Sequence, residues 1–433
     1  MPPTLALCYP LTVTIMQNDI TPGFHGTDYV KITVFGFAVT ALWQSLHTII
    51  LPLRLLDFVA ESQKNTLLGL LTLAGLLLAM VVQPVAGAIS DRSRFRWGRR
   101  RPYILIGVVF SLLIIPGIGW VGSYAAVFLV YCLLQVASNT AQGPYQAFIP
   151  ELVPENKHGM ASGVKSLFEI LGGVAFVYVS SLFMDRYSIG DGSQWLWFSL
   201  GLLALVMLAA MIATVVLVRE PKMPGESRHS LLWTLGHTLK DIKSNGDFIW
   251  FLVSRLLVFM AFAAIQKFAL YYLRDVIGVD NPAGATATFS IVAVVGMLLV
   301  VYPAGYFSDR LGRRPVIMTS GLLGAAGIAI IALTEDYNII LAAAGVIGLA
   351  MGGFNSSNWA LATDLAAKGE EARYLGISNM ATACGSALSG LFGIGIDFFN
   401  NYGEGLGYRF MLLACIFFFA AGALSILKLR RCR

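Results

Sequence analysis

The sequence predicts an all-α protein that crosses a membrane twelve times, with its helices arranged in two bundles of six. The composition, the order of the apolar segments and an internal repeat each support this prediction. Of the 433 residues, 57% are hydrophobic and 12% are charged, whereas soluble domains carry about 25% charged residues. This composition excludes a soluble enzyme, a disordered protein and a small disulfide-linked scaffold. The five cysteines are scattered, so they indicate neither a disulfide framework nor a zinc site.

Twelve segments are apolar enough to span a membrane, which takes roughly 20 mostly apolar residues in a helix. In the first half they are Val30–Leu56, Leu67–Ile89, Tyr103–Trp120, Ala125–Ile149, Ala161–Met184 and Leu196–Val218. In the second half they are Phe248–Tyr272, Ala287–Phe307, Val316–Leu333, Ile339–Thr363, Leu375–Phe398 and Phe410–Leu427. We therefore expect six spans on each side of a central break.

The polar segments set the expected domain boundaries. Arg219–Asp247 is the longest polar stretch and contains Pro221, Pro224 and Gly225, which is typical of a linker. We expect an N-terminal tail at 1–29, a six-helix bundle at 30–218, a linker at 219–247, a second bundle at 248–427 and a tail at 428–433. The first tail lacks the pattern of a cleaved signal peptide, and Met16 is an alternative start.

The basic residues predict the orientation in the membrane. Most lysines and arginines fall in the tails, the central linker and every second connection, and few fall in the connections on the other side. Because basic connections stay on the cytoplasmic side, we expect cytoplasmic termini and a multi-pass protein of the plasma (inner) membrane. The same distribution accounts for the net charge of +6 without a nucleic-acid partner.

The two halves repeat each other. The segment GAISDRSRFRWGRRRP (Gly87–Pro102) matches GYFSDRLGRRP (Gly305–Pro315), and both connect the second and third spans of their half. The offset between Pro102 and Pro315 also places Glu151 on Asp364. Parallel repeats of this kind form two bundles related by an axis along the membrane normal, and transporters built this way bind their solute between the halves.

The doubled GxxSDRxxGRRP pattern resembles the signature loop of the major facilitator superfamily, over Val30 to Leu427. The longer first version, SDRSRFRWGRRRP, is similar to the loop of the sucrose and glycoside–cation symporter branch. The resemblance implies a secondary active transporter, not an enzyme. Such a protein moves a small-molecule solute through the lipid bilayer by alternating access. The expected coupling cation is H+ or Na+, and we expect a monomer with no cofactor and no metal.

Two alternatives stay open, namely an exporter of drugs or metabolites and a non-transporting membrane sensor or assembly factor. The sequence contains no G-x-x-x-x-G-K-[ST] phosphate loop. Any transport is therefore expected to draw on an ion gradient or on the gradient of the solute itself.

The resemblance implies that the repeated loop closes the cytoplasmic side in one state and releases it in another. The forked guanidinium groups of arginine suit carboxylate partners. We expect one cluster in each half, consisting of Asp91, Arg99, Arg100, Arg101 and Glu151, and of Asp309, Arg313, Arg314 and Asp364. The alternative is that these basic residues only set the topology.

The resemblance also implies that the first, fourth, seventh and tenth spans line a central cavity. Polar residues recur at helical spacing in these spans, which in lipid must face protein or water. The candidate cavity residues are Gln44, His47, Gln135, Asn139, Gln142, Gln146, Gln266, Lys267, Asn355, Asn358, Trp359 and, in the eleventh span, Asn379. The alternatives are hydrogen bonding between helices for the amides and snorkelling for the lysine. Amide-rich lining favours a sugar-like solute, and a cavity-facing Arg255 or Lys267 favours an anionic or polyhydroxylated one.

Glu169 is the one acid deep within an apolar segment, and Lys165 precedes it by one helical turn. Ionisable groups inside a bilayer are usually functional. Glu169 with Lys165 is therefore the candidate for ion coupling, and a structural ion pair is the alternative.

Overall fold

The computed structural model describes residues 25–93, 95, 97–154, 157–220, 246–366 and 371–429. Most of the expected N-terminal tail, central linker and C-terminal tail lies outside these residues. In the described part of the chain, the regular elements are all helical, and twelve helices are long and apolar enough to span a membrane. The predicted fold class is thereby confirmed.

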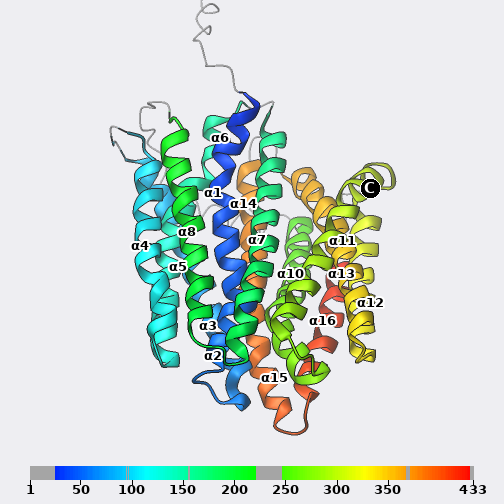
Figure 1. Ribbon diagram of the computed structural model, residues 1–433. Coiled ribbons are helices and arrows are strands. Elements are labelled where there is room, and N and C mark those ends of the chain that lie inside the picture. The colour runs from blue at the N-terminus through cyan, green and yellow to red at the C-terminus, as the bar shows by residue number, and fades with distance from the viewer. Residues whose placement is uncertain are drawn as a thin grey trace, which may run out of the picture.

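The first six spans contain the helices of the N-terminal half, which run from blue to green in Figure 1. They are α1 (Gly26–Ser45) with η1 (Leu46–Ile50) and α2 (Leu51–Leu55); η2 (Glu61–Gln63) with α3 (Lys64–Asp91); α4 (Arg101–Trp120); α5 (Tyr124–Gln146) with α6 (Phe148–Leu152); α7 (His158–Ser188); and α8 (Gln194–Leu217).

The second six spans follow in the same order, from green to red. They are α10 (Gly246–Tyr272) with η4 (Leu273–Ile277); α11 (Pro282–Leu311); α12 (Arg313–Leu333); α13 (Tyr337–Leu365); α14 (Glu371–Leu388) with η5 (Ser389–Leu391) and α15 (Phe392–Asn400); and α16 (Leu406–Ser425) with η6 (Ile426–Lys428). We call the end of the molecule that carries the repeated loops the motif side, at the top of Figure 1. The end that carries α2, η2 and α15 is the opposite side.

Helix caps explain why several spans begin before their predicted apolar segment. The Asn281 side chain accepts a hydrogen bond of 2.6 Å from the Gly284 N–H, and Pro282 occupies the first helical position. Asparagine caps and a proline in the first turn both favour a helix start. The eighth span therefore begins at Pro282 and not at Ala287. The pattern of apolar residues alone does not reveal such caps.

The first span contains a π-helical turn at Leu46–Ile50, which the apolar pattern did not predict. Pro52 follows this turn and has no N–H for the regular helical hydrogen bond. The N–H of Leu51 bonds to the carbonyl of Leu46, five residues earlier, so the helix is locally wider. The seventh span ends in a similar turn at Leu273–Ile277, followed by Gly278 with a φ of 69°.

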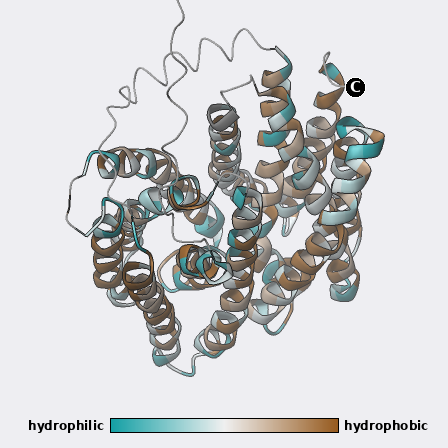
Figure 2. Cartoon of the chain, turned by 90° about the horizontal axis from the view of Figure 1, so that it is seen from above, coloured by the Kyte–Doolittle hydropathy of each residue, from teal (hydrophilic) through white to brown (hydrophobic). Residues whose placement is uncertain are grey.

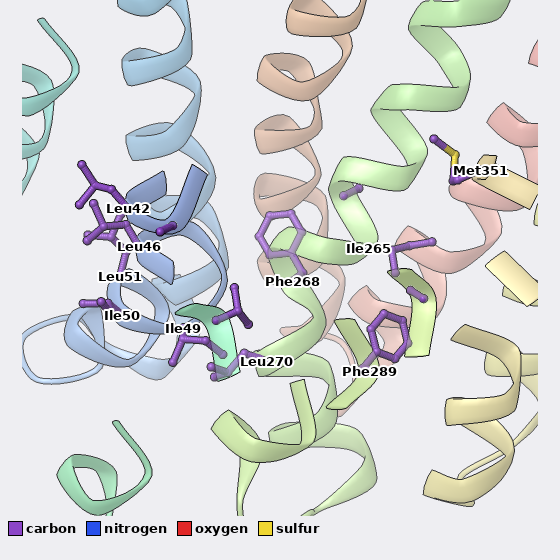
Figure 3. Close-up of a cluster of buried hydrophobic side chains, with 14 of the residues drawn as sticks. Leu42, Leu46, Ile49, Ile50, Leu51, Ile265, Phe268, Leu270, Phe289 and Met351 are labelled. Carbon is purple, nitrogen blue, oxygen red and sulfur yellow. The ribbon is translucent and has the colours of Figure 1, made fainter. Parts of the chain in front are cut away.

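Figure 2 shows predominantly apolar residues along the helices. Large hydrophobic side chains on the outside are strongly exposed, for example Leu299 at 68% and Phe417 at 65%. Such exposure suits helices whose outer faces contact lipid tails. A buried apolar cluster extends from the first span to the second half, and Figure 3 places Ile49 of η1 beside Leu270 of α10.

The two halves approach most closely where α3 crosses η5 and α15 on the opposite side. A Cβ atom at Gly69 would lie 2.0 Å from the carbonyl oxygen of Gly390, and one at Gly393 would lie 2.1 Å from that of Asn65. Only glycine permits backbones to pass this closely. Through these contacts, the second half packs directly against the first on the opposite side.

Candidate functional site

The two halves enclose a central cavity with two lobes. The first lobe, of about 470 Å³, is lined from α1, η1, α3, α5, α10 and α14. The second lobe, of about 700 Å³, is lined from α1, η1, α7, α10, α11 and α13. The residues common to both lobes are Thr40, Gln44, Thr48, Phe262 and Gln266. Volumes of this size suit small molecules.

The polar wall of the first lobe is a chain of hydrogen bonds that starts at His47. Gln135 Nε2 donates to the Tyr131 hydroxyl at 2.9 Å, and Nε2 of His47 lies at hydrogen-bond distance, 2.8 Å, from the same hydroxyl. Asn139 donates to the Gln135 side chain at 2.9 Å, and the Trp43 ring stacks on His47. The fourth span (α5) thus contacts the first span through Tyr131, directly behind the lining residues His47 and Gln135.

Glu169 is the acid among the described residues that line the second lobe. Its carboxylate lies 3.8 Å from Lys165 Nζ, one turn earlier in α7. Lys165 also donates a hydrogen bond of 2.7 Å to Gln146. Gly36 of α1 leaves room for the acid, since a Cβ there would lie 3.1 Å from Glu169 Cγ. The acid and the amine therefore form a pair whose carboxylate faces the cavity.

Two cations of α10 have only neutral partners in the described part of the chain. Lys267 lines the first lobe and donates to Ser389 Oγ at 2.9 Å and to the carbonyl of Ser386 at 3.3 Å. Arg255 is buried and donates to Thr382 at 2.7 Å and to Asn358 at 2.5 Å. Neither residue forms an ion pair with a described carboxylate.

The other predicted cavity residues fall in three positions. Gln142 lines the first lobe, and Asn355 and Trp359 line the second. Asn358 is fully buried and contacts Arg255 behind the wall. Gln146 and Asn379 are exposed and are not among the residues that line either lobe. The polar residues that recur at helical spacing therefore line the cavity along only part of each helix.

On the motif side of the first half, Arg100 is the centre of the cluster. It is nearly buried and bonds Asp91, Glu151, Ser90 Oγ and, at 3.1 Å, the carbonyl of Gly87. Burial opposes the charge of Arg100, but its bonds to Glu151 and Asp91 outweigh this, so its pKa lies above the ordinary value. Arg100 therefore stays charged.

The neighbours of Arg100 divide between two carboxylates. Arg99 lies 2.7 Å from Glu151, whereas Arg101 contacts the carbonyl of Val215 at 2.9 Å and Glu220 at 3.7 Å. Arg101 therefore contacts Glu220 and not Asp91 or Glu151, the carboxylates of its predicted cluster.

The second half repeats this cluster in a more exposed form. Arg313 pairs with Asp309 and lies 3.1 Å from Asp364. Arg314 donates to the carbonyl of Leu429. Each cluster joins helices within its own half.

Glu220 is a carboxylate outside the clusters that the sequence predicts. Its side chain accepts hydrogen bonds from the backbone N–H groups of Arg99, Arg100 and Arg101, at 2.7, 2.9 and 2.8 Å. A carboxylate at the start of α4 satisfies free N–H groups and favours the helix dipole. Gly98, with a φ of 125°, lets the carboxylate approach. The signal available in the sequence was an acid directly after the sixth span.

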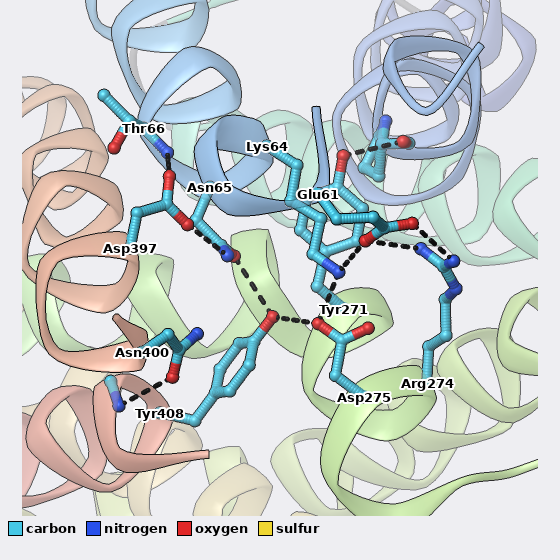
Figure 4. A network of polar contacts seen from close by, with 12 residues as sticks. Glu61, Lys64, Asn65, Thr66, Tyr271, Arg274, Asp275, Asp397, Asn400 and Tyr408 are labelled. Atoms are coloured by element: carbon cyan, nitrogen blue, oxygen red, sulfur yellow. Dashed lines mark hydrogen bonds and ion pairs between the residues drawn. The ribbon is translucent and has the colours of Figure 1, made fainter. Parts of the chain in front are cut away.

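The hydrogen bonds and ion pairs between the two halves, among the described residues, gather on the opposite side (Figure 4). Lys64 lies 2.6 Å from both Glu61 and Asp275, and Arg274 donates to Glu61 at 2.7 Å. Tyr408 donates to Asp275 at 2.5 Å. We call this set, together with Asn65, Thr66 and Asp397, the opposite-side network. Local sequence patterns do not predict this network, because its members come from distant spans.

The twelve-helix fold and the cavity shared by its halves define a membrane transporter. The chain belongs to the MFS/sugar transport protein family, which it matches over residues 34–428. The predicted superfamily is thereby confirmed, since the matched family is one of transport proteins.

Several curated relatives match parts of the chain. Sucrose transport protein SUT1 of Oryza sativa subsp. japonica is 30% identical over 157 residues, 31% of this chain and 27% of the rice protein. The lactose permease of Leuconostoc lactis is 23% identical over 258 residues, 54% of this chain and 40% of the permease. The uncharacterized symporter YnaJ of Bacillus subtilis is 25% identical over 362 residues, 78% of this chain and 72% of that protein. The first two matches thus span less than half of the relative.

Solved structures share the fold. A mutant form of the nucleoside transporter NupG has a TM-score of 0.73 at 15% identity and covers 93% of this chain and 100% of its own. The D-xylose-proton symporter has a TM-score of 0.71 at 15% identity and covers 93% and 98%.

Proposed function

We propose that this protein is a cation-coupled symporter that moves a sugar-like solute across the plasma membrane by alternating access. The observation that carries the proposal is the two-lobed cavity, lined from both halves by amides, hydroxyls and aromatic rings. Amides and hydroxyls bind the hydroxyl groups of a polyol, and aromatic faces cover its apolar C–H surface. The names of the sucrose transport protein and the lactose permease among the relatives support the same class of solute.

The motif side is proposed to be cytoplasmic, because its connections carry most of the basic residues. With this orientation, the hydrogen bonds and ion pairs between the halves lie on the outer side, which supports a conformer that opens toward the cytoplasm. Release of the opposite-side network, with closure of the motif side, gives the alternate state. The cavity is complete within one chain, which supports a monomer as the transporting unit.

Glu169 is proposed to exchange the coupling proton or cation. It faces the second lobe and lies beside Lys165, so the bound cation and the lysine compete for the same carboxylate. Coupling requires such a competition, because the occupancy of the acid then changes the charge at the cavity wall.

The test is uptake into proteoliposomes of the purified chain, with radiolabelled sucrose, lactose and xylose under an imposed pH or sodium gradient. We expect gradient-driven uptake of at least one sugar. In Glu169→Gln we expect this uptake to be lost while exchange of labelled for unlabelled sugar continues. Glu404→Gln, at an exposed acid outside the cavity, is the matched control. Full gradient-driven uptake in Glu169→Gln would remove the coupling role, and no movement of any solute would favour a sensor.

A further inference from the structure

Lys267 is buried at the wall of the cavity and is not a surface lysine. Its exposed fraction is 8%, and it lines the first lobe. Its two recorded contacts are neutral, namely Ser389 Oγ and the carbonyl of Ser386. An ammonium group has three N–H donors. One donor thus remains for the cavity, on a group that has lost most of its hydration.

The charges around the cavity do not balance. Among the described residues that line either lobe, Glu169 is the acid, and it is already paired with Lys165. Lys267 has no such partner, and Arg255 stands directly behind the wall, with its guanidinium 5.2 Å from the Phe259 ring and 4.8 Å from the Trp359 ring. Buried charges are normally paired. The described residues in and directly behind the cavity wall therefore include more basic side chains than acidic ones.

The neutral groups near Lys267 suit hydroxyls. Gln266 is adjacent in the chain, and His47, Gln135 and Ser386 line the same lobe. The partner that this arrangement lacks is an anion, since amides, hydroxyls and an aromatic ring are already present. A carboxylate on a polyhydroxylated solute supplies the missing charge.

We propose that Lys267 is the anion-binding residue of the solute site and that the transported solute is a sugar acid, with its carboxylate on Lys267 and its hydroxyls on the amides of the first lobe. This inference rests on the proposed transport function and specifies its substrate class. Arg255, twelve residues earlier in α10 and hence about 18 Å toward the motif side, adds to the positive potential along the path.

Two matched pairs of probes test the proposal. Gluconate and sorbitol differ in one carboxylate against one CH2OH group, and lactobionate and lactitol form the same pair at disaccharide size. Binding is followed by the fluorescence of the purified full chain, because Trp43 and Trp359 line the two lobes. We expect the acid of at least one pair to bind at least tenfold more tightly than its neutral partner.

Three variants locate the effect. In Lys267→Gln we expect the affinity for the acid to fall about 10- to 100-fold, the usual loss for a hydrogen bond to a charged group, with less than a threefold change for the neutral probe. Lys267→Arg keeps the charge and should retain the preference for the acid. Lys31→Gln removes a lysine that pairs with Asp28 at the start of α1 and should change neither affinity.

The outcomes separate this inference from the proposed function. No preference for the acid in either pair, or an unchanged preference in Lys267→Gln, overturns the sugar-acid proposal, and gradient-driven sucrose uptake would then leave the transporter proposal intact. An equal loss for both members of a pair, with a lowered unfolding temperature, also overturns it, because Lys267 would then only tie α10 to η5. Equal binding of chloride and gluconate overturns the substrate class.

Discussion

Asn65 in α3 donates a hydrogen bond of 2.8 Å to the carboxylate of Asp397 in α15, although the two residues lie 332 positions apart. The backbone N–H of Thr66 donates to the other carboxylate oxygen at 2.6 Å. Both bonds join the first half to the second on the opposite side. The proposed alternating access requires these bonds to break in each cycle, and their strength would then help to set the balance between the two states.

Asp397→Asn should shift the protein toward the state that is open on the opposite side. The change removes the charge from two hydrogen bonds, and a bond to a charged group contributes about 1.5–3 kcal/mol. A shift of at least about tenfold in the population of the two states follows. Spin labels on η2 and α15 would measure it as a longer distance distribution. Asp280→Asn, at an exposed acid on the same side, is the control, and identical distances in both variants would contradict the prediction.

Gly69→Ala should destabilise the present conformer. The new Cβ would lie 2.0 Å from the carbonyl oxygen of Gly390, a backbone atom that cannot turn aside. Overpacking of this kind costs about 1–3 kcal/mol. Gly201→Ala is the matched control, because a Cβ there meets nothing within 4 Å and alanine favours a helix. Thermal unfolding in detergent would compare the two, and a Gly69→Ala protein as stable as Gly201→Ala would refute the close packing of α3 against η5.

Arg100→Ala should cost far more stability than the corresponding Arg313→Ala. The Arg100 side chain is 3% exposed, and its removal leaves Asp91 without its cation and Glu151 with Arg99 alone. Breaking a buried pair costs about 3–5 kcal/mol. Arg313 is 23% exposed, and its partner Asp309 is 68% exposed, so about 0–1 kcal/mol is expected there. Chemical unfolding of both variants measures the difference. Equal losses would mean that the two repeated loops are energetically alike.

Glu220→Ala should loosen the start of α4. The carboxylate accepts three backbone hydrogen bonds, and loss of a helix cap costs about 0.5–2 kcal/mol. Hydrogen exchange at the amides of Arg99, Arg100 and Arg101 should accelerate, since these N–H groups lose their acceptor. Glu335→Ala, at an exposed acid in a different connection, should leave their exchange unchanged. Slow exchange in Glu220→Ala would show that another group caps this helix.

Features that depend on nearby residues were accessible from the sequence. The number and order of the spans follow from runs of apolar side chains. The spacing of Gln135, Asn139 and Gln142 puts them on one helix face, and all three line the first lobe. Lys165 and Glu169 meet because residues four apart are neighbours on a helix.

Features that depend on how helices pack were not accessible. The spacing of polar residues in the fourth span (α5) predicted Gln146 as a cavity residue. Gln146 instead lies outside both lobes and accepts a hydrogen bond from Lys165. Arg101 and Glu220 meet because α4 begins where α8 ends. The spacing of polar residues shows which face of a helix they share, but it does not show where along the helix the cavity begins and ends.

Composition and the doubled loop by themselves determined a twelve-span membrane protein with two similar halves, because the membrane selects apolar helices by local residue type. Only the tertiary structure decided which polar groups face each other, such as Asn65 with Asp397 and Arg255 with Asn358. Those partners sit on helices far apart in the chain. Asn65 meets Asp397 through the packing of the two halves, and Arg255 meets Asn358 through helix packing within the second half; no local pattern encodes either.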